Sequence, residues 1–539
     1  MLYFFFFLCS SCCCSSSSSS SSSSVLFSKT YAIMVDCPPL YYLDHRKKTP
    51  PNLHSLAALQ DERAPSLHPI NTNPGLHSAH AKQQFFHNKM AKLCAGLCLL
   101  LGALAFLAIA APGSSSFVER QGTQFVLDGS PYLFNGFNSY WMMTVASQPA
   151  ERAKVSQVLG EAATAGLTVC RTWAFSDGGD GALQISPGVY DERVFQGLDF
   201  VVSEAQSHGV RLILSLVNNY KDFGGRAQYV QWASNAGVAV SGEDDFYTNP
   251  VVKGYYKNHV QRVLTRINTI TNVAYKDDPT IMAWELINEP RCQADYSGKT
   301  VNAWVQEMAS YTKSLDSKHM LEIGMEGFYG DSMPEKKQYN PGYQVGTDFI
   351  TSNLIDEIDF ATIHAYPDVW LAAQDDASQT AFAQRWTWSH WDDATKILKK
   401  PLVLAEFGLS KKDPSYTENL RDVYINAICT DIYNLARSGG GSLSGGLVWQ
   451  VMAEGMESYY DGYEIVLSQD PSTDAVLMRQ SRAMSVLAHT MSKPAGGQIG
   501  HADEAAAREQ DDGVAHGARL HGLHLRHVHA RDGKRRSHP

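Results

Sequence analysis

The sequence predicts a protein of the α/β class, built as a single (β/α)8 barrel of the TIM type. Between residues 112 and 493, short apolar runs rich in β-branched residues alternate with amphipathic stretches. Such alternation is typical of parallel strands joined by helices. Eight of these runs occur, and eight strands over about 375 residues fit a closed barrel with insertions better than an open sheet. The chain has 539 residues, 44% of them hydrophobic, which is enough to fill such a core.

The expected strands are the eight apolar runs, at residues 132–138, 168–175, 211–218, 281–288, 319–326, 360–364, 402–406 and 446–451. Amphipathic segments between them predict helices, among them 151–165, 191–207, 251–270 and 417–437. In a barrel of this kind, the groups that act on a ligand project from the carboxyl ends of the strands. The residues that end each run are therefore the first candidates for function.

The segment before the barrel divides into two parts. Residues 1–89 form a low-complexity head with a serine run from Ser15 to Ser24, which we interpret as an upstream extension of the gene model. Residues 90–111 begin with Met90 and Lys92, continue as an uncharged apolar run and contain a small-residue cleavage site around Ala110. This pattern is typical of a secretory signal peptide, and it predicts a secreted, extracellular protein. The apolar run is also about long enough to span a bilayer, so an uncleaved anchor is the alternative.

The segment after the barrel, residues 494–539, is rich in Ala, Gly, Arg and His. We interpret it as a disordered tail or a mis-spliced end. A metal-binding tail through His521, His524, His527 and His529 is the alternative, but no carboxylate or cysteine cluster beside these histidines supports it. The barrel region itself holds three widely spaced cysteines, Cys170, Cys292 and Cys429, which allow at most one disulfide.

Charge and composition limit the partners. The net charge of −10 provides no global basic field that would hold nucleic acid or an anionic membrane. We therefore expect no nucleic-acid partner and no stable membrane partner. We also expect a monomeric protein. The aromatic content of 11% suits a ligand with apolar faces and polar edges, although it also suits a large core.

Polar side chains end most of the predicted strands, where burial without a partner is costly. They are Arg171 and Trp173, Asn218 and Tyr220, Asn288 and Glu289, His364 and Tyr366, Glu406, and Trp449. Two carboxylates at the mouth of one barrel suit glycoside hydrolysis, in which one protonates the leaving oxygen and the other attacks carbon or activates water. Glu289 and Glu406 are this pair. Glu285 is the nearest rival, but its position deep in the fourth strand favours a structural role.

These motifs carry a resemblance to a known family. Residues 284–290, Trp-Glu-Leu-Ile-Asn-Glu-Pro, resemble the Asn-Glu-Pro signature of glycoside hydrolase family 5, whose members are (β/α)8 barrels with retaining chemistry. Residues 171–178, 215–220, 326–330 and 364–367 resemble the plant endo-β-1,4-mannanases of that family. The resemblance runs from Phe117 to Lys493 and includes neither the head nor the histidine-rich tail.

The resemblance implies a role for each candidate. Glu289 would be the acid/base and Glu406 the nucleophile. The expected substrate-binding residues are Arg171 and Tyr366 beside the nucleophile, His364 near Glu289, Asn288 at the sugar 2-hydroxyl, Trp449 as the platform under the sugar, and Trp173 as a cleft wall. Tyr220 would be a second wall or a core residue.

The expected activity is retaining endo-hydrolysis of β-1,4-mannosidic bonds in the mannan, galactomannan and glucomannan of cell walls. Neither a cofactor nor a metal is expected. An endo-β-1,4-glucanase of the same family is one alternative, because glucan and mannan differ only at the 2-hydroxyl stereocentre. A non-catalytic glycan-binding barrel is the other, but a lectin would gain nothing from a second carboxylate opposite the first.

Overall fold

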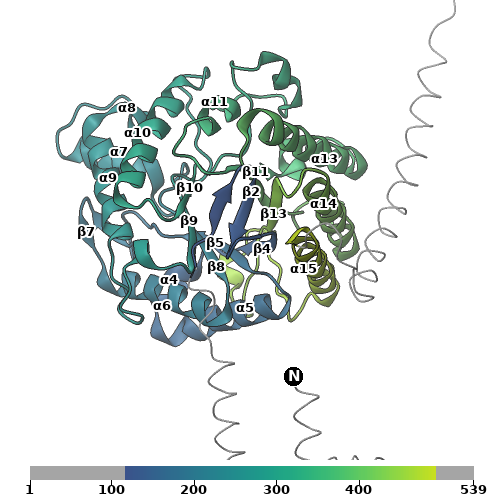
Figure 1. The fold of residues 1–539 in the computed structure, drawn as a ribbon. Helices are drawn as coiled ribbons and strands as arrows, with labels where there is room; N and C mark the ends of the chain where they lie inside the picture. Colours follow the sequence, from purple (N-terminus) through teal and green to yellow (C-terminus); the bar gives the residue numbers. More distant parts are fainter. Residues whose placement is uncertain (1–115, 493–539) are drawn as a thin grey trace, which may run out of the picture. The chain divides into compact units, whose positions relative to one another are not determined.

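The computed structural model describes residues 116–492, which fold into the predicted barrel. Eight parallel strands lie at the centre and helices surround them (Figure 1). The strands are β4 (Phe134–Asn138), β5 (Val169–Trp173), β8 (Arg211–Ser215), β9 (Ile281–Glu285), β10 (Met320–Glu322), β11 (Ala361–Ala365), β12 (Leu402–Phe407) and β13 (Leu443–Val448). The (β/α)8 prediction is therefore confirmed.

Each strand pairs with its neighbours in chain order, and β13 pairs back onto β4. The sheet order begins at β10 and ends at β11. Between these two strands the backbone N–H of His364 donates to the carbonyl of Glu326 at 3.0 Å, and that of Asp359 donates to Leu321 at 2.8 Å. These bonds bring the two ends of the sheet together, so the barrel is nearly closed.

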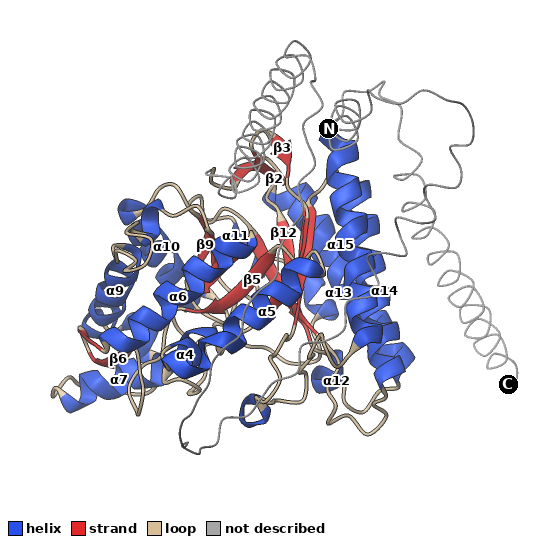
Figure 2. Ribbon diagram, turned by 90° about the horizontal axis from the view of Figure 1, so that it is seen from below, coloured by secondary structure: helices blue, strands red, loops and turns tan. Residues whose placement is uncertain are grey.

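The helices cover the outside of the strands, as Figure 2 shows from a second direction. They are α4 (Met142–Ala146), α5 (Arg152–Thr164), α6 (Glu192–His208), α7 (Gly225–Asn235), α8 (Asp245–Thr248), α9 (Pro250–Leu264), α10 (Lys299–Leu315), α11 (Phe349–Asn353), α12 (Pro367–Trp370), α13 (Asp376–Asp393), α14 (Glu418–Ser438) and α15 (Pro471–Ser492). Local signals define several ends. Asp191 caps α6, Gly209 ends it with a φ of 69°, and Asn249 caps α9 directly before Pro250.

Two apolar clusters form the core. The larger one lies between the helices and the outward faces of the strands. The smaller one includes inward-facing strand residues such as Phe134, Val169 and Val403, together with Phe125. Phe125 belongs to an antiparallel sheet of β1 (Glu119–Gln121), β2 (Gln124–Leu127) and β3 (Ser130–Pro131), and its ring packs against Phe134 and Phe360. This sheet therefore closes the amino-terminal end of the barrel.

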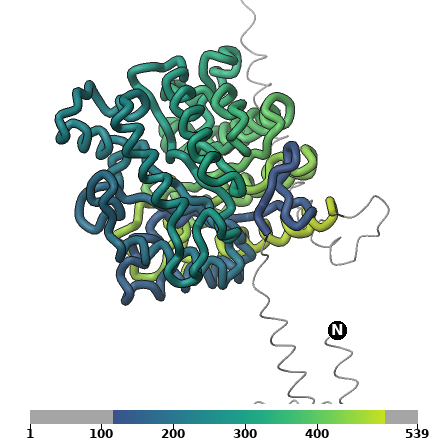
Figure 3. The backbone as a smooth tube through the Cα atoms, turned by 60° about the vertical axis from the view of Figure 1, so that its left-hand side comes forward, coloured from purple at the N-terminus to yellow at the C-terminus, as the bar shows by residue number. Residues whose placement is uncertain are grey.

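The last strand of the amino-terminal sheet, β3, packs against α15, which is the last described helix (Figure 3). A second small sheet, β6 (Gln184–Ser186) with β7 (Val189–Tyr190), belongs to the insertion between β5 and α6. Cys170, Cys292 and Cys429 are all buried and free, so the one disulfide that the sequence allowed is not formed. Within residues 116–492, no helix combines the length and apolar character that a bilayer span requires.

The predicted strand limits differ from the observed ones by one to four residues in most strands, and the third strand ends at Ser215 rather than at residue 218. The fourth strand ends at Glu285 rather than at residue 288, the fifth ends at Glu322 rather than at residue 326, and the eighth begins at Leu443 rather than at residue 446. The predicted head, signal segment and histidine-rich tail, at residues 1–89, 90–111 and 494–539, lie outside the described residues.

Candidate active site

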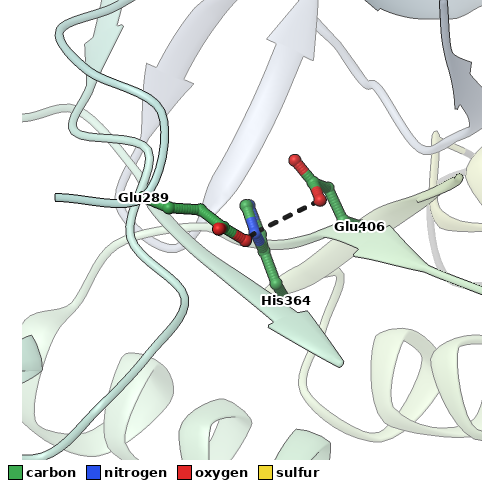
Figure 4. A group of neighbouring side chains, drawn as sticks. All are labelled: Glu289, His364 and Glu406. Atoms are coloured by element: carbon green, nitrogen blue, oxygen red, sulfur yellow. Dashed lines mark hydrogen bonds and ion pairs between the residues drawn. The ribbon is translucent and has the colours of Figure 1, made fainter. Parts of the chain in front are cut away.

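The candidate site lies at the carboxyl ends of the strands, where three polar side chains meet (Figure 4). His364 comes from β11, Glu406 from β12 and Glu289 from the segment after β9. The Nδ1 atom of His364 lies 2.6 Å from Oε1 of Glu289 and 3.5 Å from Oε2 of Glu406. One oxygen of each carboxylate and this nitrogen all lie within 4.8 Å of one another.

A β-bulge turns Glu406 into the mouth of the barrel. The pairing of β11 with β12 shifts between Ile363 and His364, so that Ile363 pairs with Leu404 and His364 with Glu406. Ala405 is the extra residue, and it belongs to the inner apolar cluster. Without the bulge, strict alternation would send residue 406 to the opposite side of the strand from Ala405.

Two donors hold the carboxylate of Glu406. Nη1 of Arg171 donates to Oε1 at 2.5 Å, and the hydroxyl of Tyr366 donates to Oε2 at 2.6 Å. Burial raises the pKa of Tyr366 well above its usual value, and the charge of Glu406 adds to this effect. The phenol therefore keeps its proton and remains a donor to Glu406.

The backbone of Glu289 is unusual for a residue that is not glycine. Its φ is 51°, in the left-handed region, and Pro290 follows it. Its N–H donates to the carbonyl of Gly324 at 2.8 Å, and the N–H of Asn288 donates to Val217 at 2.8 Å. Bonds to the strand segments on both sides thus hold a conformation that costs about 1–3 kcal/mol.

A fully buried arginine, Arg171, pairs with Glu285 as well as with Glu406. The guanidinium of Arg171 makes a bidentate pair with Glu285, and it also donates to Asn138 at 3.1 Å and to Asn288 at 2.6 Å. Glu285 has no exposed surface. The rival carboxylate is therefore a partner of Arg171 inside the barrel, whereas Glu289 and Glu406 line the open cleft.

The surroundings shift the pKa values of both cleft carboxylates. Burial raises the pKa of Glu289, against the opposing charge of Arg291 and a hydrogen bond from Tyr220. Burial also raises the pKa of Glu406, although the charge of Arg171 and the hydrogen bond from Tyr366 oppose the shift. The charge of Glu289 raises the pKa of Glu406 further, which is expected when two carboxylates share one site.

Burial lowers the pKa of His364 and favours its neutral imidazole, although the charge of Glu406 opposes the shift. Its Nε2 atom is buried and has no hydrogen-bond partner among residues 116–492. The single ring proton is therefore best placed on Nδ1, which faces the two carboxylates. This arrangement makes His364 a donor that orients Glu289.

The same three residues form the one group of His, Cys, Asp or Glu within residues 116–492 whose ligand atoms could surround a metal ion. Both oxygens of Glu406 already accept hydrogen bonds. The cationic Arg171 lies 2.5 Å from one of them and would repel a second cation. The donor set therefore suits acid/base and nucleophilic chemistry better than metal binding.

Aromatic side chains form much of the wall of a cleft of about 480 Å³ around the carboxylates. Trp449 lies almost parallel to Tyr140, with ring centroids 5.9 Å apart and planes inclined by 11°. Trp173 packs near Trp449, and the guanidinium of Arg171 lies 4.9 Å from the centroid of the Trp173 ring. Flat rings beside a polar floor are suited to the faces and edges of a sugar.

A second cavity of about 530 Å³, between the segment 338–342 and α13, contains none of the predicted site residues.

All eight predicted site residues converge here. Arg171, Trp173, Asn288, Glu289, His364, Tyr366, Glu406 and Trp449 line the cleft or contact a residue that does. Tyr220, which the sequence left open between wall and core, lines the cleft as well. The lining also contains residues that the predicted set does not include, namely Tyr140, Asn218, Asp222, Phe223, Arg291, Glu326, Val369, Trp370, Asp461 and Tyr463.

Some of the additional residues carried a signal in the sequence. Arg291 directly follows the Asn-Glu-Pro motif, and Glu326 ends the fifth predicted strand. The two form a bidentate ion pair at 2.6 and 2.8 Å, beside Glu289. Asp461 and Tyr463 come from the long connection after β13, where no strand end marks them.

Comparisons with known proteins agree with this geometry. Residues 115–458 match the model of the family described as GH family 5 beta-mannosidase-like. A mannan endo-1,4-beta-mannosidase of Solanum lycopersicum is 67% identical over 69% of this chain and 90% of its own length. One from Oryza sativa subsp. japonica is 56% identical over 71% of this chain and 89% of its own length.

A solved endo-1,4-beta-mannanase of Rhizomucor miehei is 31% identical, with a TM-score of 0.57, over 69% of this chain and 99% of that one. The endo-beta-1,4-mannanase of Thermotoga petrophila has the same identity and TM-score over 66% of this chain and 77% of that one. From the family match over most of the barrel, together with relatives this similar, it follows that the chain belongs to glycoside hydrolase family 5, in its β-mannosidase-like group.

Proposed function

We propose that this protein is a retaining endo-β-1,4-mannanase that cuts internal bonds of mannan, galactomannan and glucomannan in cell walls. The observation that carries the proposal is the pair Glu289 and Glu406, whose carboxylate oxygens approach within 4.8 Å across an aromatic cleft. Retaining enzymes have carboxyl groups about 5–5.5 Å apart, whereas inverting enzymes need about 6.5–9.5 Å to admit a water. The short separation supports a covalent intermediate.

In the first step, a carboxylate oxygen of Glu406 attacks the anomeric carbon while the glycosidic C–O bond breaks. Glu289 gives its proton to the leaving oxygen, which departs as a free hydroxyl. The assignment rests on the donors at each group. Glu406 accepts from the cationic Arg171 and from Tyr366, and both stabilise a charged nucleophile. Burial raises the pKa of both carboxyl groups, but only Glu406 accepts a hydrogen bond from an arginine, so Glu289 is the one that keeps the proton an acid needs.

In the second step, the glycosyl ester removes the negative charge of Glu406, so Glu289 loses a charged neighbour that opposed its ionisation. Glu289 then takes a proton from water, the water oxygen attacks the anomeric carbon, and Glu406 leaves as a carboxylate. Two displacements at one carbon keep the β configuration.

Four further residues have proposed roles in binding. The amide oxygen of Asn288 accepts a hydrogen bond from Arg171, and its amide nitrogen donates one to Asn218, so its second amide hydrogen is available for the sugar 2-hydroxyl. Trp449 is the platform for the sugar at the cleavage point, with Trp173 and Tyr220 as walls. No cofactor takes part in this scheme.

The substrate is tested by incubating the purified chain with galactomannan and, in parallel, with carboxymethylcellulose. We expect new reducing ends from galactomannan only, with viscosity falling faster than sugar is released. Activity on carboxymethylcellulose without activity on mannan would identify an endo-β-1,4-glucanase. Binding of mannan without any new reducing ends would identify a glycan-binding barrel.

The proposal extends to the location and the state of the protein. We infer that translation starts at Met90, that residues 90–111 direct secretion, that residues 112–493 are the catalytic domain, and that the mature enzyme is an extracellular monomer. Amino-terminal sequencing of the secreted protein should begin close to Pro112. A mature protein that retains residues 1–89, or that stays in the membrane fraction, would contradict this part of the proposal.

A further inference from the structure

Asp461 lies in the cleft beside the proposed sugar platform, and its carboxylate accepts three hydrogen bonds. The indole N–H of Trp449 donates to Oδ2 at 2.7 Å, and the amide nitrogen of Gln450 donates to the same oxygen at 2.9 Å. The backbone N–H of Tyr463 donates to Oδ1 at 2.9 Å. Each of the two carboxylate oxygens of Asp461 therefore accepts at least one hydrogen bond.

This arrangement requires a carboxylate. An asparagine has one acceptor oxygen and one donor nitrogen. With its oxygen toward Trp449, its amide group would face the backbone N–H of Tyr463. With the side-chain amide turned by 180°, its NH₂ group would instead face the two donors from Trp449 and Gln450. Either orientation of an asparagine at this position leaves at least one donor opposite another donor.

The loop that carries Asp461 is itself fixed on both sides. The hydroxyl of Tyr140 donates to the carbonyl of Tyr459 at 3.1 Å, and the hydroxyl of Tyr463 donates to Asp368 at 2.7 Å. Tyr140 is also the ring that lies parallel to Trp449. Ring and loop are therefore held relative to each other by stacking and by hydrogen bonds.

The terminal torsion of an aromatic side chain is broad, so packing alone leaves the plane of an indole some freedom to turn. A hydrogen bond from the indole N–H to a fixed carboxylate removes that freedom. We propose that Asp461 is a positioning residue that sets the ring plane of Trp449, so that the ring meets the sugar at the cleavage point as the transition state forms. This inference rests on the proposed glycoside hydrolase function and adds a residue to its machinery.

A double-mutant cycle tests the inference. We expect Asp461→Asn to lower kcat/KM on mannopentaose by about 10²-fold, mostly through kcat, because a small misplacement of a positioning group has effects of this size. Trp449→Phe removes the N–H that Asp461 holds. In that background, Asp461→Asn should lower kcat/KM by no more than about threefold, because residues that act together are not additive.

The molecule provides a matched control. Asp316 accepts the indole N–H of Trp284 at 2.8 Å, and both residues are buried away from the cleft. Asp316→Asn breaks the same kind of bond, so it should lower the melting temperature while leaving kcat/KM per folded molecule unchanged. Asp461→Ala introduces no new donor, and it serves as the second variant if Asp461→Asn does not fold.

A spectroscopic measurement gives a readout that does not depend on activity. In protein labelled with 5-fluorotryptophan, the ¹⁹F resonance that disappears in Trp449→Phe belongs to Trp449. It should shift or broaden in Asp461→Asn and Asp461→Ala but not in Asp316→Asn. An unchanged resonance, or an equal loss of kcat/KM in the wild-type and Trp449→Phe backgrounds, would overturn the inference. Inactivity of the wild-type chain on mannan would instead overturn the proposed function.

Discussion

Arg171 and Arg266 are buried arginines that each pair with two carboxylates, but their surroundings differ. Arg171 lies in the barrel mouth between Glu285 and Glu406. Arg266 lies after α9 and pairs with Asp199 and Glu192 of α6. The first cluster opens onto the cleft, whereas the second is packed between helices and contributes no residue to it.

The difference lies in how completely the carboxylates are satisfied. Asp199 accepts from Arg266, from the hydroxyls of Tyr275 and Thr269, and from the backbone N–H of Thr269. Burial opposes its ionisation, but these hydrogen bonds outweigh burial and hold the pKa of Asp199 below its usual value. Such a group is stable in one charge state and serves the fold.

Glu406 has fewer fixed donors and another carboxylate as its neighbour. Burial raises its pKa in spite of Arg171, and Glu289 contributes to the shift. A carboxylate that is held in place but accepts few hydrogen bonds keeps lone pairs that can attack a substrate. Its charge is also less stabilised, so it is more reactive than a carboxylate such as Asp199. An arginine with two carboxylates can therefore be structural or reactive, and the remaining donors decide which.

The largest effect that separates the two clusters is on turnover. Glu406→Ala should lower kcat on every mannoside by on the order of 10⁵-fold, because no covalent intermediate can form. Its melting temperature should equal or exceed that of the wild type, because Arg171 keeps Glu285 and a carboxylate with a raised pKa is removed. Initial rates and thermal melting measure the two quantities. A variant that melts much earlier than the wild type would show that Glu406 is structural.

The complementary change should affect stability instead. Asp199→Ala leaves Arg266 without its bidentate partner, and we expect a loss of about 3–5 kcal/mol in the free energy of unfolding. The rate per folded molecule should not change. Urea unfolding monitored by circular dichroism, with activity assayed at low urea, measures both.

The pH dependence of this loss has a defined sign. The folded pKa of Asp199 lies below its ordinary value of 3.8. Its contribution is therefore fully present above pH 3.8 and is lost as the pH falls through the folded pKa. The difference between the variant and the wild type should shrink in acid, and a difference that grows in acid would contradict the assignment.

A smaller effect concerns the pH profile of the reactive cluster. Burial, helped by the charge of Glu289, raises the pKa of Glu326 to about 7. Glu326→Gln removes this negative charge and leaves the cation of Arg291 unpaired, and both changes favour ionisation of Glu289. Because the acid must be protonated, the alkaline limb of kcat/KM should move to lower pH, by about one unit.

The control for this prediction is Glu307→Gln. Glu307 pairs with Lys253 and Lys257 at 2.6 and 2.7 Å, outside the cleft. Its replacement should leave the alkaline limb in place. A limb that moves to higher pH in Glu326→Gln would mean that Glu326 does not act on Glu289 through its charge.

Much of the barrel was predictable, because its strands are apolar runs whose spacing is visible in the sequence. The limits of β9 were not. Leu286 and Ile287 continue the apolar pattern, yet the N–H groups of residues 286–289 bond to two different neighbouring segments and Glu289 turns into the left-handed region. The sheet of β1, β2 and β3 has strands of two to four residues, too short to show alternation.

The residues of the site likewise divide into those that the sequence predicted and those that it did not. Residues that end strands, such as Arg171 and Glu406, were predicted because a polar group after an apolar run stands out. The bulge at Ala405 that turns Glu406 inward is a property of pairing between strands, which one sequence does not display. Asp461 comes from a loop without periodicity, and only its hydrogen bonds to Trp449 and Gln450 reveal it.

The most direct test of the roles of Glu289 and Glu406 is azide rescue on an aryl β-mannoside with an acidic leaving group. Glu289→Ala should glycosylate Glu406 in a burst and then stall, because no base activates water. Azide should restore turnover of this variant and give the β-mannosyl azide, with the configuration retained. If azide instead gives the inverted α-mannosyl azide with Glu289→Ala and the β-mannosyl azide with Glu406→Ala, the roles of the two carboxylates are reversed.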